Sequence, residues 1–261
     1  MAGVYLPLAA GLFGAALLGL VPPALAAPAP PRDCGVAESF YAFEPPLPKT
    51  IRALRSGGET VIAAVGGAST LGRAAGGREH AWPARLSEAL VKRIPAARVK
   101  MVNLGVPRQT AREAAARLER EVIPLKPALV IWETGTMEAV RGADIEDFRE
   151  TVQEGVGRLR AAGAEVVLMD MQFSRRSSAV IDFESYLAVL RQLADAIDVP
   201  LFPRHSIMHH WAESGQIDLA VTDPEKRRLV AIRLYDCLGR EMADFVTRGS
   251  QLPGAAPGSG R

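Results

Sequence analysis

The stretch TVIAAVGGAST, residues 60–70, decides the fold. Its first six residues form a short apolar run rich in β-branched side chains, which is typical of a buried strand. Two glycines then interrupt the run, so the chain is expected to turn there and to enter a helix. Ser69 follows this turn. Its hydroxyl either is exposed at the end of the strand or only caps the next helix, and both interpretations stay open.

Strands and helices alternate along the rest of the chain. Short apolar runs predict four more strands at residues 98–105, 128–135, 164–171 and 199–203. Amphipathic spacing predicts helices at residues 81–94, 110–123, 144–163 and 223–246. This alternation indicates one α/β domain in three layers, with a parallel sheet between two layers of helices. Functional residues in such sheets follow the carboxyl ends of the strands.

Three of the predicted helices have clear start signals. Thr110 and Glu113 have the spacing of a capping box, in which each side chain bonds the backbone of the other residue. Asp144 is a capping residue for the third helix. Asp223 precedes Pro224, and proline is favoured at the first helical position. These signals fix where the helices begin.

The N-terminal segment has the pattern of a secretory signal. An apolar run extends from Leu8 to Leu20, prolines follow, and Ala24-Leu25-Ala26 fits a small-x-small cleavage site. Residues 1–26 are therefore expected to be a signal peptide, with an uncleaved anchor as the alternative. The mature protein would be periplasmic or secreted. Residues 27–59 are expected to form an N-terminal arm, 60–246 the folded domain and 247–261 a flexible tail.

The composition excludes some classes of partner and site. The formal net charge is only +2 over 261 residues, and no long block of like charge occurs, so nothing indicates nucleic-acid binding. After signal cleavage no stable membrane span is expected. The two cysteines are Cys34 and Cys237. Export permits a disulfide between them, and two buried free thiols are the alternative.

The order of four short motifs resembles the SGNH (GDSL-type) hydrolases. GGAST at 66–70 follows the first strand, NLG at 103–105 ends the second, GTME at 135–138 follows the third, and DLAV at 218–221 precedes the last helix. The resemblance covers roughly residues 60–246. It implies a flavodoxin-like parallel sheet of five strands in the order 2-1-3-4-5. No cofactor is implied.

The resemblance carries over some functional residues and not others. Ser69 matches the family's nucleophile, Gly105 its oxyanion glycine, and Asp218 the acid of the catalytic triad. Met137 falls where the family has an oxyanion asparagine, and Val221 falls where it has the catalytic histidine. Two further positions also differ, since the aspartates expected there are replaced by Ala68 and Glu138.

These replacements remove polar groups on which ester hydrolysis depends. A serine hydroxyl needs a base to take its proton, and loss of the triad histidine costs on the order of 10⁶ in turnover. Loss of one oxyanion donor costs roughly 10²–10³. The thioether of Met137 cannot replace an amide donor. The sequence therefore predicts severely reduced hydrolysis, with the fold retained.

Other residues offer weaker routes to activity. The four histidines are His80, His205, His209 and His210, and none stands three residues after an aspartate. They are expected to be structural or solvated, although one bending towards Ser69 would supply a base. Adjacent histidines on a helix diverge by about 100°, so no metal site is expected. Glu138 is a further carboxylate near the expected pocket.

Two functional hypotheses follow. In the first, the protein is a catalytically inactive SGNH-fold protein of the cell envelope that binds an acylated polysaccharide or a protein partner. In the second, it is a serine esterase or acetyl esterase with a rearranged site, in which another group activates Ser69. The distance from the Ser69 Oγ atom to the nearest imidazole or carboxylate separates the two.

Overall fold

The computed structural model describes residue 1, residue 3 and residues 34–41 and 46–248. Residues 34–41 and 46–248 belong to one compact unit. Apart from residues 1 and 3, the predicted signal peptide lies outside the described residues. So do residues 249–261 of the predicted tail, whereas residues 247 and 248 belong to the last helix.

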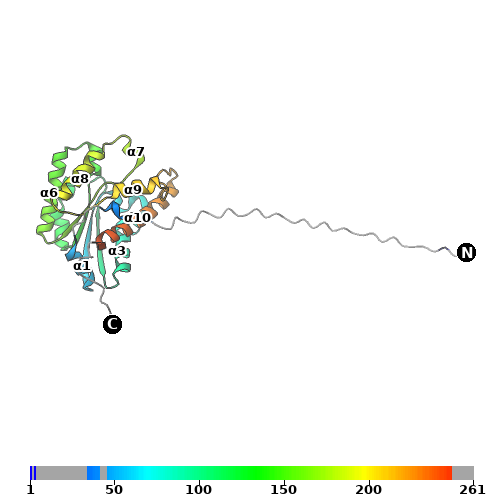
Figure 1. Cartoon of the computed structure of the whole chain (residues 1–261), viewed down its shortest axis with the longest axis horizontal. Helices are drawn as coiled ribbons and strands as arrows, with labels where there is room; N and C mark the ends of the chain where they lie inside the picture. The colour runs from blue at the N-terminus through cyan, green and yellow to red at the C-terminus, as the bar shows by residue number, and fades with distance from the viewer. Residues whose placement is uncertain (2, 4–33, 42–45, 249–261) are drawn as a thin grey trace. The chain divides into compact units, whose positions relative to one another are not determined.

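Five parallel strands form the central sheet (Figure 1). They are β1 (Glu59–Gly66), β2 (Arg98–Gly105), β3 (Leu129–Glu133), β4 (Glu165–Met169) and β5 (Leu201–Phe202). Their order is β2-β1-β3-β4-β5, which confirms the predicted fold class and strand order. Gly66 pairs with Gly105, and Val65 pairs with Trp132, so the central strands end at nearly the same level. The residues after these strands therefore meet at one edge.

Two helical layers cover the sheet (Figure 1). Successive strand residues point to opposite faces, so Ile62 and Ala64 of β1 join one hydrophobic core while Ala63 and Val65 join the other. The first core includes α1 (Pro48–Arg55), α3 (Trp82–Arg93), α9 (Arg204–Glu213) and α10 (Pro224–Arg248). The second includes α4 (Ala111–Ala115), α6 (Ile145–Ala161) and α8 (Glu184–Ala196).

Shorter elements complete the chain. The remaining α-helical turns are α2 (Ala68–Leu71), α5 (Thr136–Arg141) and α7 (Arg175–Ser178). The 3₁₀ turns are η1 (Glu38–Phe40), η2 (Arg73–Ala75), η3 (Arg78–His80) and η5 (Ile123–Leu125), and η4 (Leu118–Val122) is a π-helical turn. Most of these turns lie in the loops that follow the strands.

The predicted caps are present, but two segments differ from expectation. Thr110 and Glu113 form the capping box, and Asp144 and Asp223 accept from the first turns of their helices. The helix predicted for 110–123 ends at Ala115 and continues as π and 3₁₀ turns. Pro124 lies in the last of these turns, where it has no backbone N–H to continue a regular helix. The segment predicted as an N-terminal arm contains α1, which buries Ile51 and Leu54.

A disulfide joins Cys34 to Cys237, with the two Cα atoms 5.3 Å apart. Of the two alternatives that the sequence left open, the structure contains the bridge. Trp211 adds to this attachment by donating its indole N–H to the carbonyl of Cys34 at 2.9 Å. Residues 34–41 are therefore fastened to α9 and α10.

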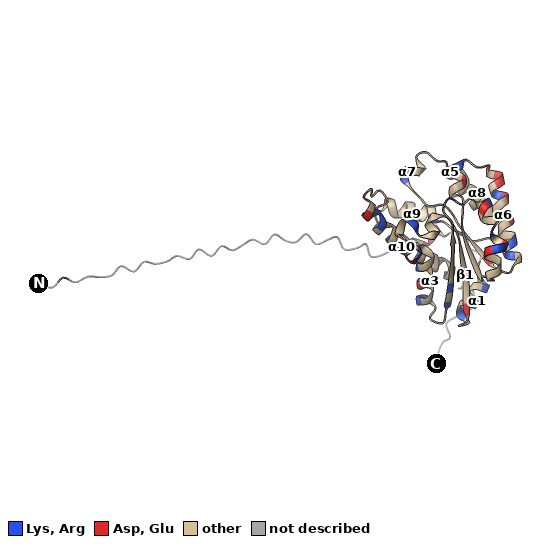
Figure 2. Ribbon diagram, turned by 180° about the vertical axis from the view of Figure 1, so that it is seen from behind, with Lys and Arg blue, Asp and Glu red and all other residues tan. Residues whose placement is uncertain are grey.

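The charged surface is mixed in sign (Figure 2). Along α6, for example, Arg149 pairs with Glu146, and Arg158 pairs with Glu119 of the preceding segment. Within the part of the chain that the structure describes, no helix is long and apolar enough to cross a membrane.

Candidate active site

Three strand ends bring polar side chains to one place. Ser69 lies on α2, immediately after β1 and its glycines. Glu133 is the last residue of β3. Arg204 is the first residue of α9, just after β5. All three are buried, and Arg204 has no exposed surface at all.

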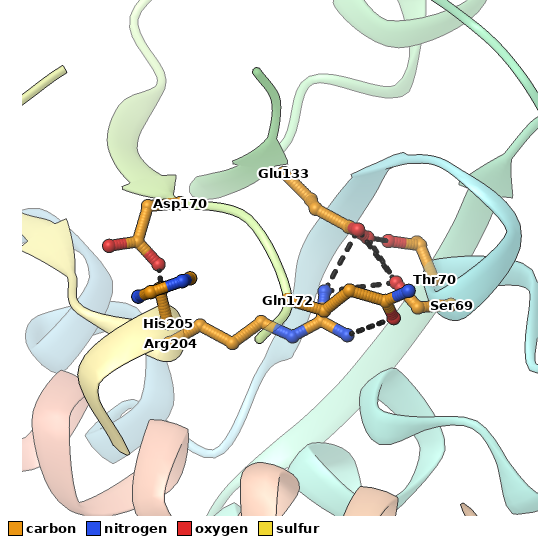
Figure 3. A network of polar contacts seen from close by, with 7 residues as sticks. All are labelled: Ser69, Thr70, Glu133, Asp170, Gln172, Arg204 and His205. Atoms are coloured by element: carbon orange, nitrogen blue, oxygen red, sulfur yellow. Dashed lines mark hydrogen bonds and ion pairs between the residues drawn. The ribbon is translucent and has the colours of Figure 1, made fainter. Parts of the chain in front are cut away.

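Ser69, Glu133 and Arg204 form a closed hydrogen-bonded ring (Figure 3). The Ser69 hydroxyl donates to the Glu133 carboxylate, with Oγ 2.6 Å from Oε1 and 2.8 Å from Oε2. Arg204 Nη1 donates to Glu133 Oε1 at 2.8 Å and to Ser69 Oγ at 3.0 Å. The serine oxygen therefore donates its proton to an anion and accepts a hydrogen bond from a cation.

Neighbouring groups complete the ring. Thr70, which is fully buried, also donates to Glu133. Arg204 Nη2 donates to Gln172 Oε1 at 3.2 Å (Figure 3), and Gln172 is exposed, unlike the members of the ring. A Cβ atom on Gly66 would lie 2.8 Å from the Glu133 Cβ atom, so only glycine lets these strands bring their polar ends together.

The electrostatics of the ring explain why its members stay together. Isolated charges buried at this depth would cost several kcal/mol each, and pairing offsets that cost only when the remaining donors and acceptors are satisfied. Glu133 accepts from two hydroxyls and one guanidinium. Removing any one partner would leave a buried polar group without its hydrogen bond.

A small pocket of about 160 Å³ opens beside Ser69. Its walls come from the loops after β1, β2, β3 and β4, and its lining includes Ala68, Arg108, Thr136, Met137 and Gln172. Arg108 has a φ of 63°, an uncommon conformation for a residue other than glycine. This volume is large enough for a short acyl group.

The two predicted oxyanion positions, Gly105 and Met137, both lie close to Ser69. Met137 lines the pocket beside Ser69. Gly105 packs against the turn that carries Ser69, since a Cβ atom there would lie 3.0 Å from the carbonyl oxygen of Gly67. The Gly105 N–H donates to the Asn103 side chain at 3.0 Å, so this donor is already used within the chain.

The predicted acid and histidine positions lie elsewhere. Asp218 is exposed, and its carboxylate accepts from the backbone N–H of Ala220 at 2.9 Å in a local turn. Val221 is partly exposed. Neither residue lines the pocket beside Ser69. The ring thus contains Ser69 but neither of these two positions.

The pocket lining that the structure describes contains no histidine. His205 and His209 pack against the Phe173 ring with centroids 5.4 and 4.6 Å away, and His210 packs against Phe40 at 5.2 Å. Burial lowers the pKa of His205. His80 is half-exposed on η3. No group of three or more potential ligands among the described residues could hold a metal ion.

Two further buried carboxylates flank the site. Asp170 follows β4 and accepts from the backbone N–H of His205 at 2.7 Å (Figure 3). Burial raises its pKa to about 7. Burial also raises the pKa of Glu138, which follows Met137 and accepts from the backbone N–H of Ala111. Both groups are placed to remain protonated at higher pH than an ordinary carboxyl.

Reasoning from the sequence missed Glu133, Thr70, Arg204 and Gln172. A signal for Glu133 was present, because an acid that ends an apolar strand such as LVIWE lies at the functional edge of a parallel sheet. Arg204 gave no comparable signal. Its burial depends on an acid 71 positions away in the sequence.

The comparisons with known proteins place the fold. A model of the non-GDSL lipase-like family matches residues 33–252. Thioesterase 1/protease 1/lysophospholipase L1 of Escherichia coli (strain K12) is 28% identical over 127 residues, covering 47% of this chain and 56% of that protein. The chain thus spans little more than half the length of the curated relatives it matches.

Two solved structures share the architecture. A two-domain esterase active on acetylated mannans, crystallised with mannopentaose, superposes with a TM-score of 0.61 at 20% identity, covering 80% of this chain and 56% of that one. A catalytic mutant of an acetylxylan esterase from Geobacillus stearothermophilus has a TM-score of 0.55 at 16% identity, covering 74% and 94%. These likenesses confirm the SGNH-hydrolase fold that the sequence resembles.

Proposed function

The chain belongs to the non-GDSL lipase-like family, and from that premise we propose that it is a non-hydrolysing binding protein for acylated polysaccharide of the cell envelope. The observation that carries this proposal is the closed ring of Ser69, Glu133 and Arg204. We further propose that the protein is exported, as its N-terminal sequence predicts, so that it meets such a ligand.

The chemistry of the ring favours binding over hydrolysis. Attack by Ser69 requires a base to remove its proton, and among the described residues the base in contact is the carboxylate of Glu133. A carboxylate is intrinsically a weaker base than imidazole. The Glu133 oxygens also accept hydrogen bonds from Arg204 and Thr70, so they are engaged within the chain. Met137 supplies no hydrogen-bond donor for an oxyanion.

The pocket suits the acyl part of the ligand. Its volume of about 160 Å³ accommodates an acetyl group, with Ala68 and Met137 as apolar walls. Burying one methyl group contributes roughly 1 kcal/mol, which corresponds to about a fivefold preference for the acetylated ligand. The acetylated mannans and acetylxylan on which the two structural neighbours act are ligands of this class.

Three measurements test the proposal with acetylated xylo-oligosaccharides. Calorimetry should show tighter binding of the acetylated than of the deacetylated form. Acetate release should stay near background, and a fluorophosphonate probe should not label Ser69. Met137→Trp, which fills the pocket, should abolish the acetyl preference, whereas Val140→Trp on the exposed side of α5 should retain it.

A second function has one specific observation in its favour. The Glu133 carboxylate lies 2.6 Å from the Ser69 oxygen, within direct proton-transfer distance, and Arg204 would stabilise a developing alkoxide. In that case the protein is an acetyl esterase with Glu133 as the base. Turnover of about 1 s⁻¹ or more that is lost in both Ser69→Ala and Glu133→Gln would establish the esterase and refute the binding proposal.

A further inference from the structure

A second cavity is larger than the Ser69 pocket. It has a volume of about 820 Å³, within the usual range for ligand sites. Its walls are η1, the segment from Phe173 to Glu184, and the exposed face of α9. We call it the Phe40–Phe173 groove after the two phenylalanines in its lining.

Aromatic rings form much of the groove. Phe40 packs against His210, and Phe173 packs against both His205 and His209. Each imidazole combines an apolar ring with nitrogen atoms that donate or accept hydrogen bonds. Phe173 is buried beneath these imidazoles, so the accessible rings are Phe40 and the exposed His209 and His210. These rings offer apolar surface for the C–H faces of a sugar and polar atoms at their edges for its hydroxyls.

Two of the three carboxylates in the groove lining are paired with arginines. Arg191 pairs with Glu184 at 3.1 Å, and Glu213 pairs with Arg175 at 2.9 Å. Asp182 accepts hydrogen bonds from the hydroxyl and backbone N–H of Ser185 and has no ion pair among the described residues. The lining therefore disfavours an anionic ligand and leaves a neutral one acceptable. Its fixed donors and acceptors fit the hydroxyl groups of a neutral polyol.

Two segments of the chain contribute to both sites. Gln172 lines the pocket, and the next residue, Phe173, lines the groove. In the same way, the Arg204 side chain bonds Ser69 while the next residue, His205, lines the groove. The segments at 172–173 and 204–205 therefore connect the groove to the surroundings of Ser69.

From this arrangement we propose that the Phe40–Phe173 groove binds the main chain of a neutral oligosaccharide, and that the Ser69 pocket receives its acyl substituent. The inference rests on the proposed function for the second part only. The groove itself should bind an oligosaccharide without any acyl group, since its contacts are made with ring faces and hydroxyls.

Unacetylated xylohexaose and mannohexaose test the groove directly by calorimetry and by NMR titration. We expect at least one of them to bind, with affinity falling tenfold or more in Phe40→Ala and in Arg191→Ala. Arg158→Ala is the matched control, because Arg158 is likewise a partly exposed helical arginine in a surface ion pair. It should bind as the wild type does. Circular dichroism establishes that each variant is folded.

The outcomes separate this inference from the proposed function. If neither oligosaccharide binds at ligand concentrations up to about 10 mM, any dissociation constant is too weak for specific binding, and the groove assignment is wrong. The assignment is also wrong if both groove variants bind like the wild type. If acetylated ligands then still show a preference that Met137→Trp removes, the proposed function stands alone. Binding in the groove with no acetyl preference supports the groove and refutes the proposed function.

Discussion

The two halves of the expected catalytic site differ sharply in their surroundings. The half that contains Ser69 is buried, and its hydroxyl belongs to a ring with Glu133 and Arg204. The half that contains Asp218 and Val221 lies on an exposed loop, where Asp218 accepts from a backbone N–H two residues away. The first half is hydrogen-bonded to residues at the ends of three strands, whereas the second half is hydrogen-bonded within its own turn.

The family's motif gives Ser69 a catalytic role, whereas the structure also gives it a structural role, and the two halves of the site separate these roles. In the buried half, Ser69 satisfies a carboxylate and a guanidinium, so its presence is explained by the polar ring without any reaction. The residues of the exposed loop satisfy no buried charge, so substitutions there should change the stability of the fold very little. A serine retained at this position is therefore weak evidence of catalysis, and the two halves should respond very differently to mutation.

The largest expected effect is on Glu133. Glu133→Gln keeps the shape but leaves the Arg204 guanidinium buried without a counter-charge, so the free energy of unfolding should fall by about 3–5 kcal/mol. Urea denaturation measures this loss. The matched control is Glu119→Gln, which breaks the exposed pair with Arg158 and should cost less than about 1 kcal/mol.

A companion variant shows whether the charge is responsible. Glu133→Leu together with Arg204→Met replaces the ion pair by apolar groups and should recover much of the loss, as expected for buried pairs in general. Equal losses for Glu133→Gln and Glu119→Gln would mean that the ring is no more important than a surface pair, and the comparison between the two halves would collapse.

The next effect concerns pH and Asp170. Burial raises its pKa to about 7 in the folded protein, although the Arg204 and Arg191 guanidiniums and the His205 N–H act in the opposite direction. The unfolded chain has a carboxyl pKa near 4. The folded state therefore binds an extra proton between about pH 4 and pH 7, so stability from this group is complete below that window and is lost as pH rises through it.

Asp170→Asn removes this dependence, because the amide is neutral and its oxygen can still accept from His205. Relative to wild type, the variant should gain about 2–3 kcal/mol between pH 5 and pH 8, since each pKa unit corresponds to 1.36 kcal/mol. Denaturation at both pH values measures the gain. A constant difference between variant and wild type across this range would contradict the raised pKa.

A smaller effect is expected for Thr70. Thr70→Val keeps nearly the same shape and removes one hydroxyl that donates to Glu133. The free energy of unfolding should therefore fall by about 1–2 kcal/mol. Ser69→Ala should have a similar effect, because it removes the other hydroxyl donor. Thermal denaturation would show both losses. If Ser69→Ala instead stabilises the protein, Ser69 is a strained functional group and not a structural one.

The sequence predicted the fold well for a physical reason. Apolar strands such as TVIAAV and capping signals such as Thr110 with Glu113 are local, and alternation of strand and helix leaves few ways to build a parallel sheet. The disulfide was left open because pairing depends on the distance between segments 203 residues apart. Sequence pattern alone gives no such distance.

The candidate site was predicted only in part, for the opposite reason. Ser69 follows a strand and a glycine turn, which is a local signal. The ring around it is not local, since Glu133 and Arg204 come from β3 and α9 and meet only in the folded chain. Arginine is almost never fully buried without a partner, so its burial cannot be inferred before the partner is known.

The smallest effect on stability is expected on the exposed loop. Val221→His should change the free energy of unfolding by less than about 0.5 kcal/mol, because Val221 is partly exposed and has no part in the ring's hydrogen bonds. Combined with Met137→Asn it restores two polar groups typical of SGNH hydrolases. We expect acetyl-ester hydrolysis to rise above wild type by about tenfold, which is about 1.4 kcal/mol of barrier. This gain is well below the 10²–10⁴-fold rate increase that a well-placed base contributes, since the Ser69 hydroxyl must first break its hydrogen bond to Glu133.

Adding Asp218→Ala to the double variant should remove the gain, because the new imidazole would lose the carboxylate that orients it. A folded double variant with the wild-type rate would mean that residue 221 cannot reach Ser69, and the two halves would then be unrelated parts of the surface and the core.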